Sequence, residues 1–397
     1  MSPGMWHWSC CCGGEGVGVG YLFAQHYNTR KPVVVTITNG GDISYDALNP
    51  TDFDAASNTG AYPASTTSGE IVFLYQGASR RIYAGSLTMP GGVWGYGAAD
   101  IDGGNFTADA AFSYRSRIHL ASDGTVRGHL PYDSAGSPPP HREAESTTSA
   151  MVYTDLGAHP AGTSGYGFWA LDTDTWARWV TYNKALAAPV RSVAQMWKFG
   201  EAAGEDIETF DADHPLLAVG ACSMLNGKVG SLWQWYDGTE AAPRRYRLRL
   251  YVRTGAATYQ TVDMPEDAVK YSGHAFGHSM CSADIDGTEV LLIAISRIVY
   301  DGATPDYIDY MYYVVNTDTW AVTASRVVTE APYPGPYMHI TTTTENIPCM
   351  AVAGAADGDQ LTFYLGSGSS WTPYTTTLAG GFYQYGLSVA WQPYLGL

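Results

Sequence analysis

The chain has 397 residues and a formal net charge of −17 at pH 7, so it lacks the cationic surface that nucleic acid or anionic lipid would require. Only 15% of its residues are charged, whereas glycine (45), tyrosine (29) and tryptophan (12) are abundant. Aromatic residues suit the pleated surface of a sheet and glycine suits tight turns, so short strands are expected rather than long helices. No apolar run approaches the roughly 20 residues of a membrane-spanning helix.

The N-terminal stretch WHWSCCCGG combines two tryptophans with three consecutive cysteines. It lacks the basic and apolar regions of a secretory signal. A glycine run follows it and would let the tip reach a partner. We therefore predict that residues 1–16 are a docking arm, with the alternative of a frayed terminus. The residues expected to dock are Trp6, Trp8, Cys10, Cys11 and Cys12. In an oligomer these cysteines would meet as a metal site or as interchain disulfides.

Short matches recur along the rest of the chain, and internal repeats are a signature of propeller folds. TDTWA occurs at 173–177 and again at 317–321, and ADIDG occurs at 99–103 and again at 283–287. A longer apolar segment, 214–235, resembles 347–365. We interpret each pair as equivalent positions within a larger repeated unit.

One clear unit spans 277–328, where apolar and aromatic runs are separated by Asp, Asn and Gly turns. The same pattern predicts units near 17–60, 66–92, 93–146, 147–185, 190–265, 273–328 and 337–380. Their spacing is near that of four-stranded blades. The predicted fold is therefore all-β, a β-propeller of seven blades, with six blades or a set of β-sandwich domains as alternatives.

The C-terminal segment YGLSVAWQPYLGL is left over, and we expect it to close the ring by pairing with the first blade. A single propeller domain is predicted for 17–397. Within it, about 236–265 is interpreted as a long blade insertion. The segment 133–149 is interpreted as a loop, because its three prolines disfavour strand pairing.

Two acidic turns are candidate calcium sites, because alternating carboxylate oxygens around a glycine turn are ligands that calcium prefers. The residues are Asp100, Asp102 and Asn105 in one turn, and Asp284, Asp286 and Glu289 in the other. The full calcium-loop pattern with a terminal glutamate is incomplete. The alternative is a hairpin turn in which the aspartates cap backbone N–H groups.

Aromatic residues beside glycine and proline are candidates for contact with glycans or protein partners, because they offer large contact area at low entropic cost. The residues are Trp235, Tyr236, Tyr333, Tyr337, Tyr383 and Tyr385. The alternative is packing between sheets, since every second side chain of a strand points inward. Cys222, Cys281 and Cys349 are interpreted as small core residues.

Motifs for a serine nucleophile, a phosphate-binding loop or a zinc protease are absent, so a protein without catalytic activity is predicted. A glycoside hydrolase remains an alternative, because its two carboxylates come from distant segments and leave no local motif.

An acidic all-β chain rich in tyrosine and glycine, with a short N-terminal arm, resembles virion proteins of tailed bacteriophages. The resemblance implies a tail, fibre or capsid-attached component in the virion that is made in the host cytoplasm. Such a protein would assemble as an oligomer, contact other virion subunits and bind host surface polysaccharide through many weak sites. The alternatives are an extracellular carbohydrate-binding propeller lectin and, less favoured, a propeller glycoside hydrolase.

Overall fold

The structure is a computed structural model of the chain. It describes the backbone of residues 18–26, 32–47, 61–65, 71–76, 82–88, 95–100, 117–120, 126–131, 140–147, 150–158, 163–171, 178–186, 191–198, 200–210, 216–224, 227–236, 239, 246–265, 271–272, 278–301, 304–331, 337–353, 360–367, 370–377, 382–383 and 389–393. Side chains are described mainly between residues 193 and 377, and also at 18–22 and 33–45. The predicted docking arm, 1–16, lies outside the described residues.

The described strands form seven sheets, each with four or five antiparallel strands. The first sheet contains β1 (Gly18–His26), β2 (Pro32–Thr38) and β3 (Ile43–Ala47), together with β29 (Phe382–Tyr383) and β30 (Val389–Pro393). The second contains β4 (Ala61–Ser65), β5 (Ile71–Gln76), β6 (Ile82–Thr88) and β7 (Gly95–Asp100). The third contains β8 (Arg117–Leu120), β9 (Val126–Pro131), β10 (Pro140–Thr147) and β11 (Ala150–Ala158).

The remaining four sheets follow in chain order. They are β12 (Thr163–Leu171), β13 (Arg178–Leu186), β14 (Arg191–Lys198) and β15 (Glu205–Phe210); then β16 (Leu216–Ser223), β17 (Val229–Tyr236), β18 (Tyr246–Gly255) and β19 (Thr258–Asp263). Next are β20 (Tyr271–Ser272), β21 (His278–Ile285), β22 (Thr288–Asp301), β23 (Thr304–Asn316) and β24 (Val322–Ala331); then β25 (Tyr337–Thr342), β26 (Pro348–Ala353), β27 (Gln360–Ser367) and β28 (Ser370–Thr377).

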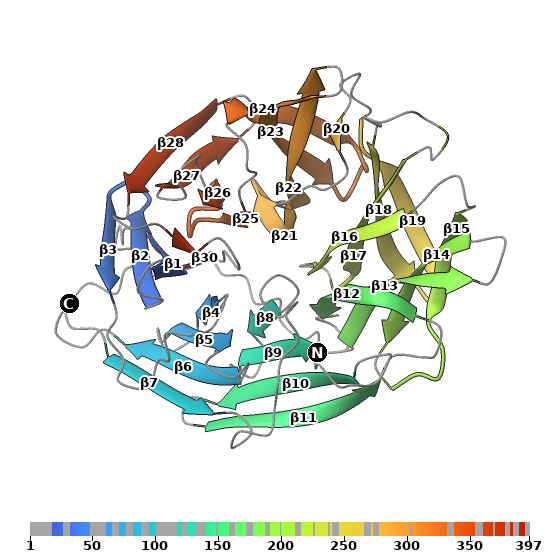
Figure 1. The fold of residues 1–397 in the computed structure, drawn as a ribbon, viewed down its shortest axis with the longest axis horizontal. Helices are drawn as coiled ribbons and strands as arrows, with labels where there is room; N and C mark the ends of the chain where they lie inside the picture. The colour runs from blue at the N-terminus through green and yellow to red at the C-terminus, as the bar shows by residue number, and fades with distance from the viewer. Residues whose placement is uncertain are drawn as a thin grey trace.

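The sheets lie around a common centre, in the manner of a β-propeller (Figure 1). The strands nearest this centre are β30, β4, β8, β12, β16, β21 and β25, and each contacts the next in this order, with β25 contacting β30. The C-terminal strand β30 pairs with β1, where Val389 lies opposite Leu22 and Pro393 opposite Gly18. Within the described ranges no residue is helical, which confirms the all-β prediction, and none belongs to a helix that could cross a bilayer.

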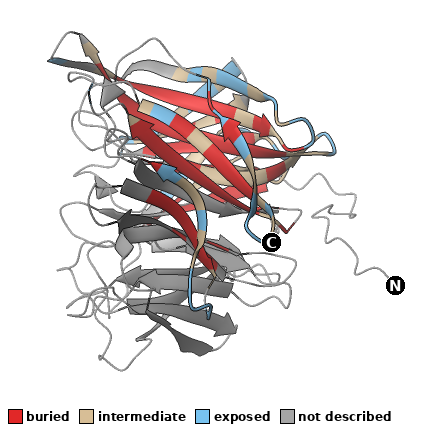
Figure 2. Ribbon diagram, turned by 90° about the vertical axis from the view of Figure 1, so that its right-hand side faces the viewer, coloured by how far each residue is buried: buried red, intermediate tan, exposed pale blue. Residues whose placement is uncertain are grey.

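Apolar side chains on both faces of the strands join neighbouring sheets, and β22 illustrates this arrangement. Leu291 and Ile293 belong to a buried cluster shared with β17 and β18, whereas Leu292 belongs to one shared with β25 and β26. Because both faces are covered, this strand reads as a continuous apolar run rather than an alternating one. Figure 2 shows buried residues along the strands and exposed residues mainly at turns and edges.

The prediction that the sequence matches mark equivalent positions is wrong. TDTWA at 317–321 joins the third and fourth strands of its sheet, β23 and β24, whereas 173–177 falls between the first and second strands, β12 and β13. ADIDG at 283–287 forms the β21–β22 turn, but its counterpart at 99–103 begins at the end of the outer strand β7. The segment 214–235 supplies a first and a second strand, and 347–365 a second and a third.

The matches instead reflect the chemistry of single turns. The side-chain oxygen of Asn316 accepts hydrogen bonds from the backbone N–H groups of Asp318 (3.0 Å) and Thr319 (2.9 Å). Asn, Asp and Thr suit such a turn wherever it occurs in a sheet.

Two predicted segment boundaries differ from the structure. The segment 236–265, predicted as an insertion, contains β18 and β19, which are the third and fourth strands of a regular sheet. The segment 133–149, predicted as a loop, contains β10, which pairs with both β9 and β11. Pro140 is the first residue of β10, a position where the missing N–H is tolerated.

Candidate functional site

A ladder of charged and aromatic side chains connects the β12–β15 sheet to the β16–β19 sheet. Arg249, Tyr251 and Arg253 lie on one face of β18, because alternate residues of a strand point the same way. They meet two glutamates of β15, Glu205 and Glu208, on the neighbouring sheet. The ladder therefore joins two sheets through side chains alone.

A β-bulge allows both glutamates to face β18. Their spacing of three residues would place them on opposite faces of a regular strand. The pairing of β14 with β15 shifts between Ala194 and Gln195, which leaves Ile207 as the extra residue. Such a bulge re-aims the side chains that flank it. The glutamates therefore both reach across to the next sheet.

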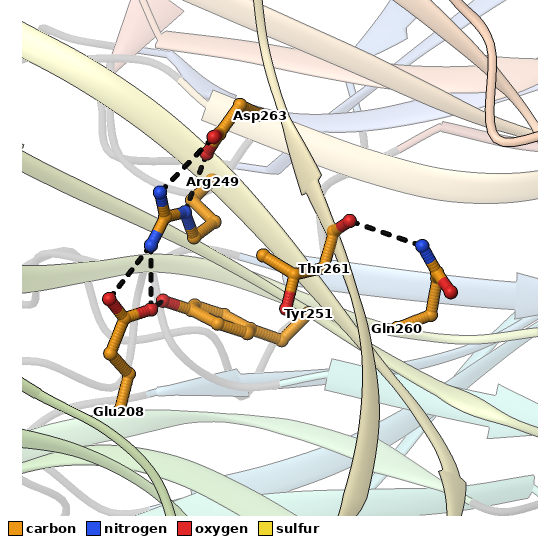
Figure 3. A network of polar contacts seen from close by, with 6 residues as sticks. All are labelled: Glu208, Arg249, Tyr251, Gln260, Thr261 and Asp263. Atoms are coloured by element: carbon orange, nitrogen blue, oxygen red, sulfur yellow. Dashed lines mark hydrogen bonds and ion pairs between the residues drawn. The ribbon is translucent and has the colours of Figure 1, made fainter.

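Each arginine of the ladder makes paired contacts with a carboxylate, and Figure 3 shows those of Arg249. Arg249 Nη1 lies 2.8 and 2.7 Å from the two carboxylate oxygens of Glu208, and its Nε lies 2.5 Å from Asp263. Arg253 contacts Glu205 at 2.9 and 2.8 Å. The tyrosine hydroxyls of Tyr251 and Tyr259 donate to Glu208 and Glu205 respectively. Two-pronged contacts of this kind are stronger and more directional than single ones.

Tryptophan rings cover the arginines from the core side. The guanidinium of Arg249 lies 4.8 Å from the centroid of Trp235, and that of Arg253 lies 4.3 Å from the centroid of Trp179. Both distances are within the range of cation–π attraction. The arginines are thus held between carboxylates and aromatic rings.

The electrostatics of the ladder favour fixed charges over proton transfer. Burial raises the pKa values of Tyr251 and Tyr259, and the glutamate that accepts each hydroxyl adds to this effect. Burial alone would raise the pKa of Glu205, but hydrogen bonds from Arg253 and Tyr259 bring it below its usual value. The tyrosines therefore remain donors and Glu205 remains an ionised acceptor, so the ladder is suited to holding the sheets together.

A second charged group is buried within the β20–β24 sheet. Arg297 donates to Asp309 at 2.8 Å across the β22–β23 hairpin, and Arg326 lies 3.6 Å from the same carboxylate oxygen. The other oxygen, Asp309 Oδ1, is buried without a hydrogen-bond partner. A buried charge of this kind is tolerated only with its partner in place.

The end of the β17–β18 hairpin carries a pair of aromatic rings that are partly accessible. Tyr236 lies opposite Tyr246, with ring centroids 4.8 Å apart and ring planes tilted by 55°. Both side chains are half-buried. Tilted ring pairs of this spacing attract each other. Tyr236 is one of the residues predicted to contact a partner.

The other predicted contact residues have different environments. Trp235 is only 7% exposed, and its ring packs at a tilt against Phe210 in the core. It therefore packs between sheets, which is the alternative to partner contact. Tyr337 lies on β25 and Tyr383 on β29, but their side chains lie outside the described residues. Tyr333 and Tyr385 lie outside them altogether.

The ADIDG turn at 283–287 uses its acidic side chains as turn caps. Asp284 Oδ1 accepts a hydrogen bond from the N–H of Gly287 at 2.8 Å, and Glu289 accepts one from Ser282 Oγ at 2.8 Å. Asp286 adopts a positive φ of 53°. These contacts agree with the alternative to a calcium site, which is a hairpin turn whose acidic side chains cap backbone N–H groups.

The calcium prediction itself stays a prediction. In the part of the chain whose side chains are described, no three His, Cys, Asp or Glu residues gather into a metal-binding group. Asp100 ends β7 with its side chain undescribed, and Asp102 and Asn105 lie outside the described residues.

Three cysteines were interpreted as core residues. The structure confirms this interpretation for one of them and agrees with it for a second. Cys349 is fully buried in the cluster shared by the first and last sheets. Cys281 packs against a neighbouring cluster, and burial raises the pKa of its thiol to about 12. The side chain of Cys222 is not among those described.

Comparisons with known proteins identify the fold. No protein-family model matches the chain, and no curated protein does. Among solved structures, it is similar to the periplasmic gluconolactonase of Pseudomonas aeruginosa, with a TM-score of 0.54 and 10% identity over 94% of this chain and 99% of that one. It is also similar to a polysaccharide lyase, an ulvan lyase, with a TM-score of 0.50 and 12% identity over 80% of this chain and 84% of that one.

These likenesses define the class of the protein as an all-β chain with a β-propeller-type fold. They do not bear on the resemblance to phage virion proteins, so that resemblance and the virion location stay predictions.

Proposed function

We propose that the protein is a carbohydrate-binding β-propeller whose seven sheets are the seven blades of a closed ring. Two observations support the closed ring. The strands nearest the centre contact one another in an unbroken succession, and the C-terminal strand pairs with the N-terminal one. This pairing removes an open sheet edge that would otherwise invite association.

The Tyr236–Tyr246 pair is the observation that carries carbohydrate binding. A half-buried aromatic pair offers a flat apolar face beside two phenolic hydroxyls, and a sugar ring presents C–H groups together with hydroxyls. The pair terminates a hairpin in a fold that is also found in a gluconolactonase and a polysaccharide lyase, two proteins whose names refer to saccharide chemistry. Tyr236 is also among the residues that the sequence predicts to contact a glycan or a protein partner.

Binding to a panel of polysaccharides by affinity gel electrophoresis tests this function. The unmodified protein is expected to be retarded by at least one glycan, and Tyr236→Ala to lose about tenfold in affinity. Thr323→Ala, an exposed position on the distant strand β24, serves as the matched control and should bind normally. If no glycan retards the protein, the proposed function is overturned.

A further inference from the structure

Tyr45 is the one large hydrophobic side chain that is exposed among those whose burial the structure describes, at 45%. It lies on β3, the outer strand of the first sheet. Other large aromatic residues with described burial are buried or half-buried. A tyrosine ring offers large contact area at low entropic cost, which suits a binding surface.

The register of the first sheet turns Tyr45 toward the β25–β28 sheet. Tyr45 lies opposite Val35, and paired residues project from the same face of a sheet. Val35 is buried in the cluster that includes Phe363 of β27, and Ile43 packs against that cluster too. Strand β3 also contacts the outer strand β28. Tyr45 therefore stands at the outer rim of the junction between the first and last sheets.

A second aromatic ring, Tyr374 of β28, is fixed at the same junction. It is half-buried and packs against the same cluster as Ile43. Its ring lies against the β2–β3 turn so closely that a Cβ atom added to Gly41 would be 1.8 Å from Tyr374 Cε1. The ring is thus packed against bare backbone, and a side chain already restricted in this way loses less entropy when a ligand binds.

Hydroxyl groups that suit a saccharide lie beside Tyr374. Alternation along β28 places Thr372 and Thr376 on the same face as Tyr374, and Thr372 is exposed. Threonine hydroxyls both donate and accept hydrogen bonds, as sugar hydroxyls do.

We propose that this rim, defined by Tyr45, Thr372 and Tyr374, is a separate binding site for a neutral saccharide. A neutral ligand is favoured because the chain carries a net charge of −17 that repels polyanionic glycans. The site rests on the proposed carbohydrate-binding function, but it is distinct from the Tyr236–Tyr246 pair, which belongs to a different sheet.

Hydrogen-exchange mass spectrometry of the full chain locates the site directly. Neutral hexasaccharides of glucose, mannose and xylose are the probes, and oligogalacturonate is the anionic comparison. A neutral probe is expected to slow exchange in the peptides that cover β3 and β28, and oligogalacturonate is not. Protection confined to the β17–β18 hairpin would overturn this site while leaving the proposed function intact. Absence of protection everywhere would overturn both.

Substitution provides the second arm. Tyr45→Ala is expected to weaken binding of the neutral probe at least tenfold, whereas Tyr45→Phe, which keeps the ring, should retain most of it. Light scattering of the same samples tests whether the rim instead joins two copies of the chain. A dimer that dissociates in Tyr45→Ala, with unchanged saccharide affinity, would contradict the proposal.

Discussion

Arg297 and Asp309 form an ion pair inside the β20–β24 sheet, with Nη2 2.8 Å from Oδ2 and side-chain exposures of 1% and 0%. Removal of the aspartate would leave the guanidinium of Arg297 buried without the carboxylate that balances its charge. We expect Asp309→Ala to lower the free energy of unfolding by about 3–5 kcal/mol, measured by urea denaturation.

The double variant Arg297→Met/Asp309→Leu is the matched control, because it removes both charges and keeps apolar volume. It should lose less stability than Asp309→Ala alone. Equal losses in the two variants would mean that packing, and not the charge, accounts for the effect.

Protonation of Glu205 should lower the free energy of unfolding in acid. Its pKa is lower in the folded protein than in the unfolded chain, where a glutamate titrates near 4.5. The folded state therefore binds a proton less readily, and the stability that Glu205 contributes is fully present above that pH and is lost as the pH falls below it. Urea midpoints measured from pH 7 to pH 3 should show a smaller acid-side loss in Glu205→Gln than in the unmodified protein.

Glu201→Gln provides the comparison for this pH series, because Glu201 is exposed and lies 3.8 Å from Lys198. Its pH profile should follow that of the unmodified protein. A Glu205→Gln profile with the same acid-side loss would show that the contact with Arg253 does not set the acid sensitivity.

Gly41→Ala should destabilise the protein more than Gly200→Ala. Both glycines have φ near +90°, at +88° and +90°, where an alanine is strained by about 1–2 kcal/mol. A Cβ atom at Gly200 meets nothing within 4 Å, whereas one at Gly41 collides with Tyr374. Thermal unfolding of the two variants therefore separates backbone strain from the steric effect, and equal melting temperatures would show that Tyr374 moves aside at no cost.

A chelator distinguishes the two interpretations of the ADIDG turn at 283–287. If Asp284 acts only as a cap for the N–H of Gly287, EDTA leaves the melting temperature unchanged and Asp284→Ala costs roughly 1 kcal/mol. We expect this result. A melting temperature that falls with EDTA and recovers with added calcium would instead support the calcium site.

Cys281 should resist alkylation in the native protein. Burial raises its thiol pKa to about 12, so the reactive thiolate is scarce at neutral pH. Cys349 is fully buried and should behave in the same way. Mass spectrometry after iodoacetamide treatment at pH 8 checks this, with the urea-unfolded chain as the fully reactive reference. Rapid labelling of Cys281 would mean that its cluster opens readily.

Local features of the sequence predicted the strands and the chemistry of their turns. The apolar run around Leu292 and the Asp-Gly turn at Asp286 indicate a hairpin by themselves, and β21 and β22 form it. The expected pairing of the C-terminal strand with the first sheet also has a local basis, because an unpaired final strand follows the last complete sheet. The position of a turn within its sheet could not be predicted, because the same residues satisfy a turn between any two antiparallel strands.

The ladder between two sheets was missed for a different reason. The alternation RLRLYVR of 247–253 indicates that its arginines share one face, and this signal was available. Their partners are not adjacent in the sequence, and Glu205 and Glu208 face the ladder only because of a bulge at Ile207. Trp235 was a candidate for partner contact because it lies near the glycine of a predicted turn, with packing between sheets as the alternative, and the structure shows Arg249 and Phe210 packed against it.

The sequence by itself determined the all-β character, the strands and the turns of this protein, because these depend on the periodicity of side chains and on backbone preferences over a few residues. Only the tertiary structure decided which side chains meet: Arg249 with Glu208, Arg297 with Asp309, and Tyr374 with the bare backbone at Gly41. The physical reason is that these contacts depend on how sheets pack against one another and on shifts in strand register, which bring together residues that no short stretch of the chain contains.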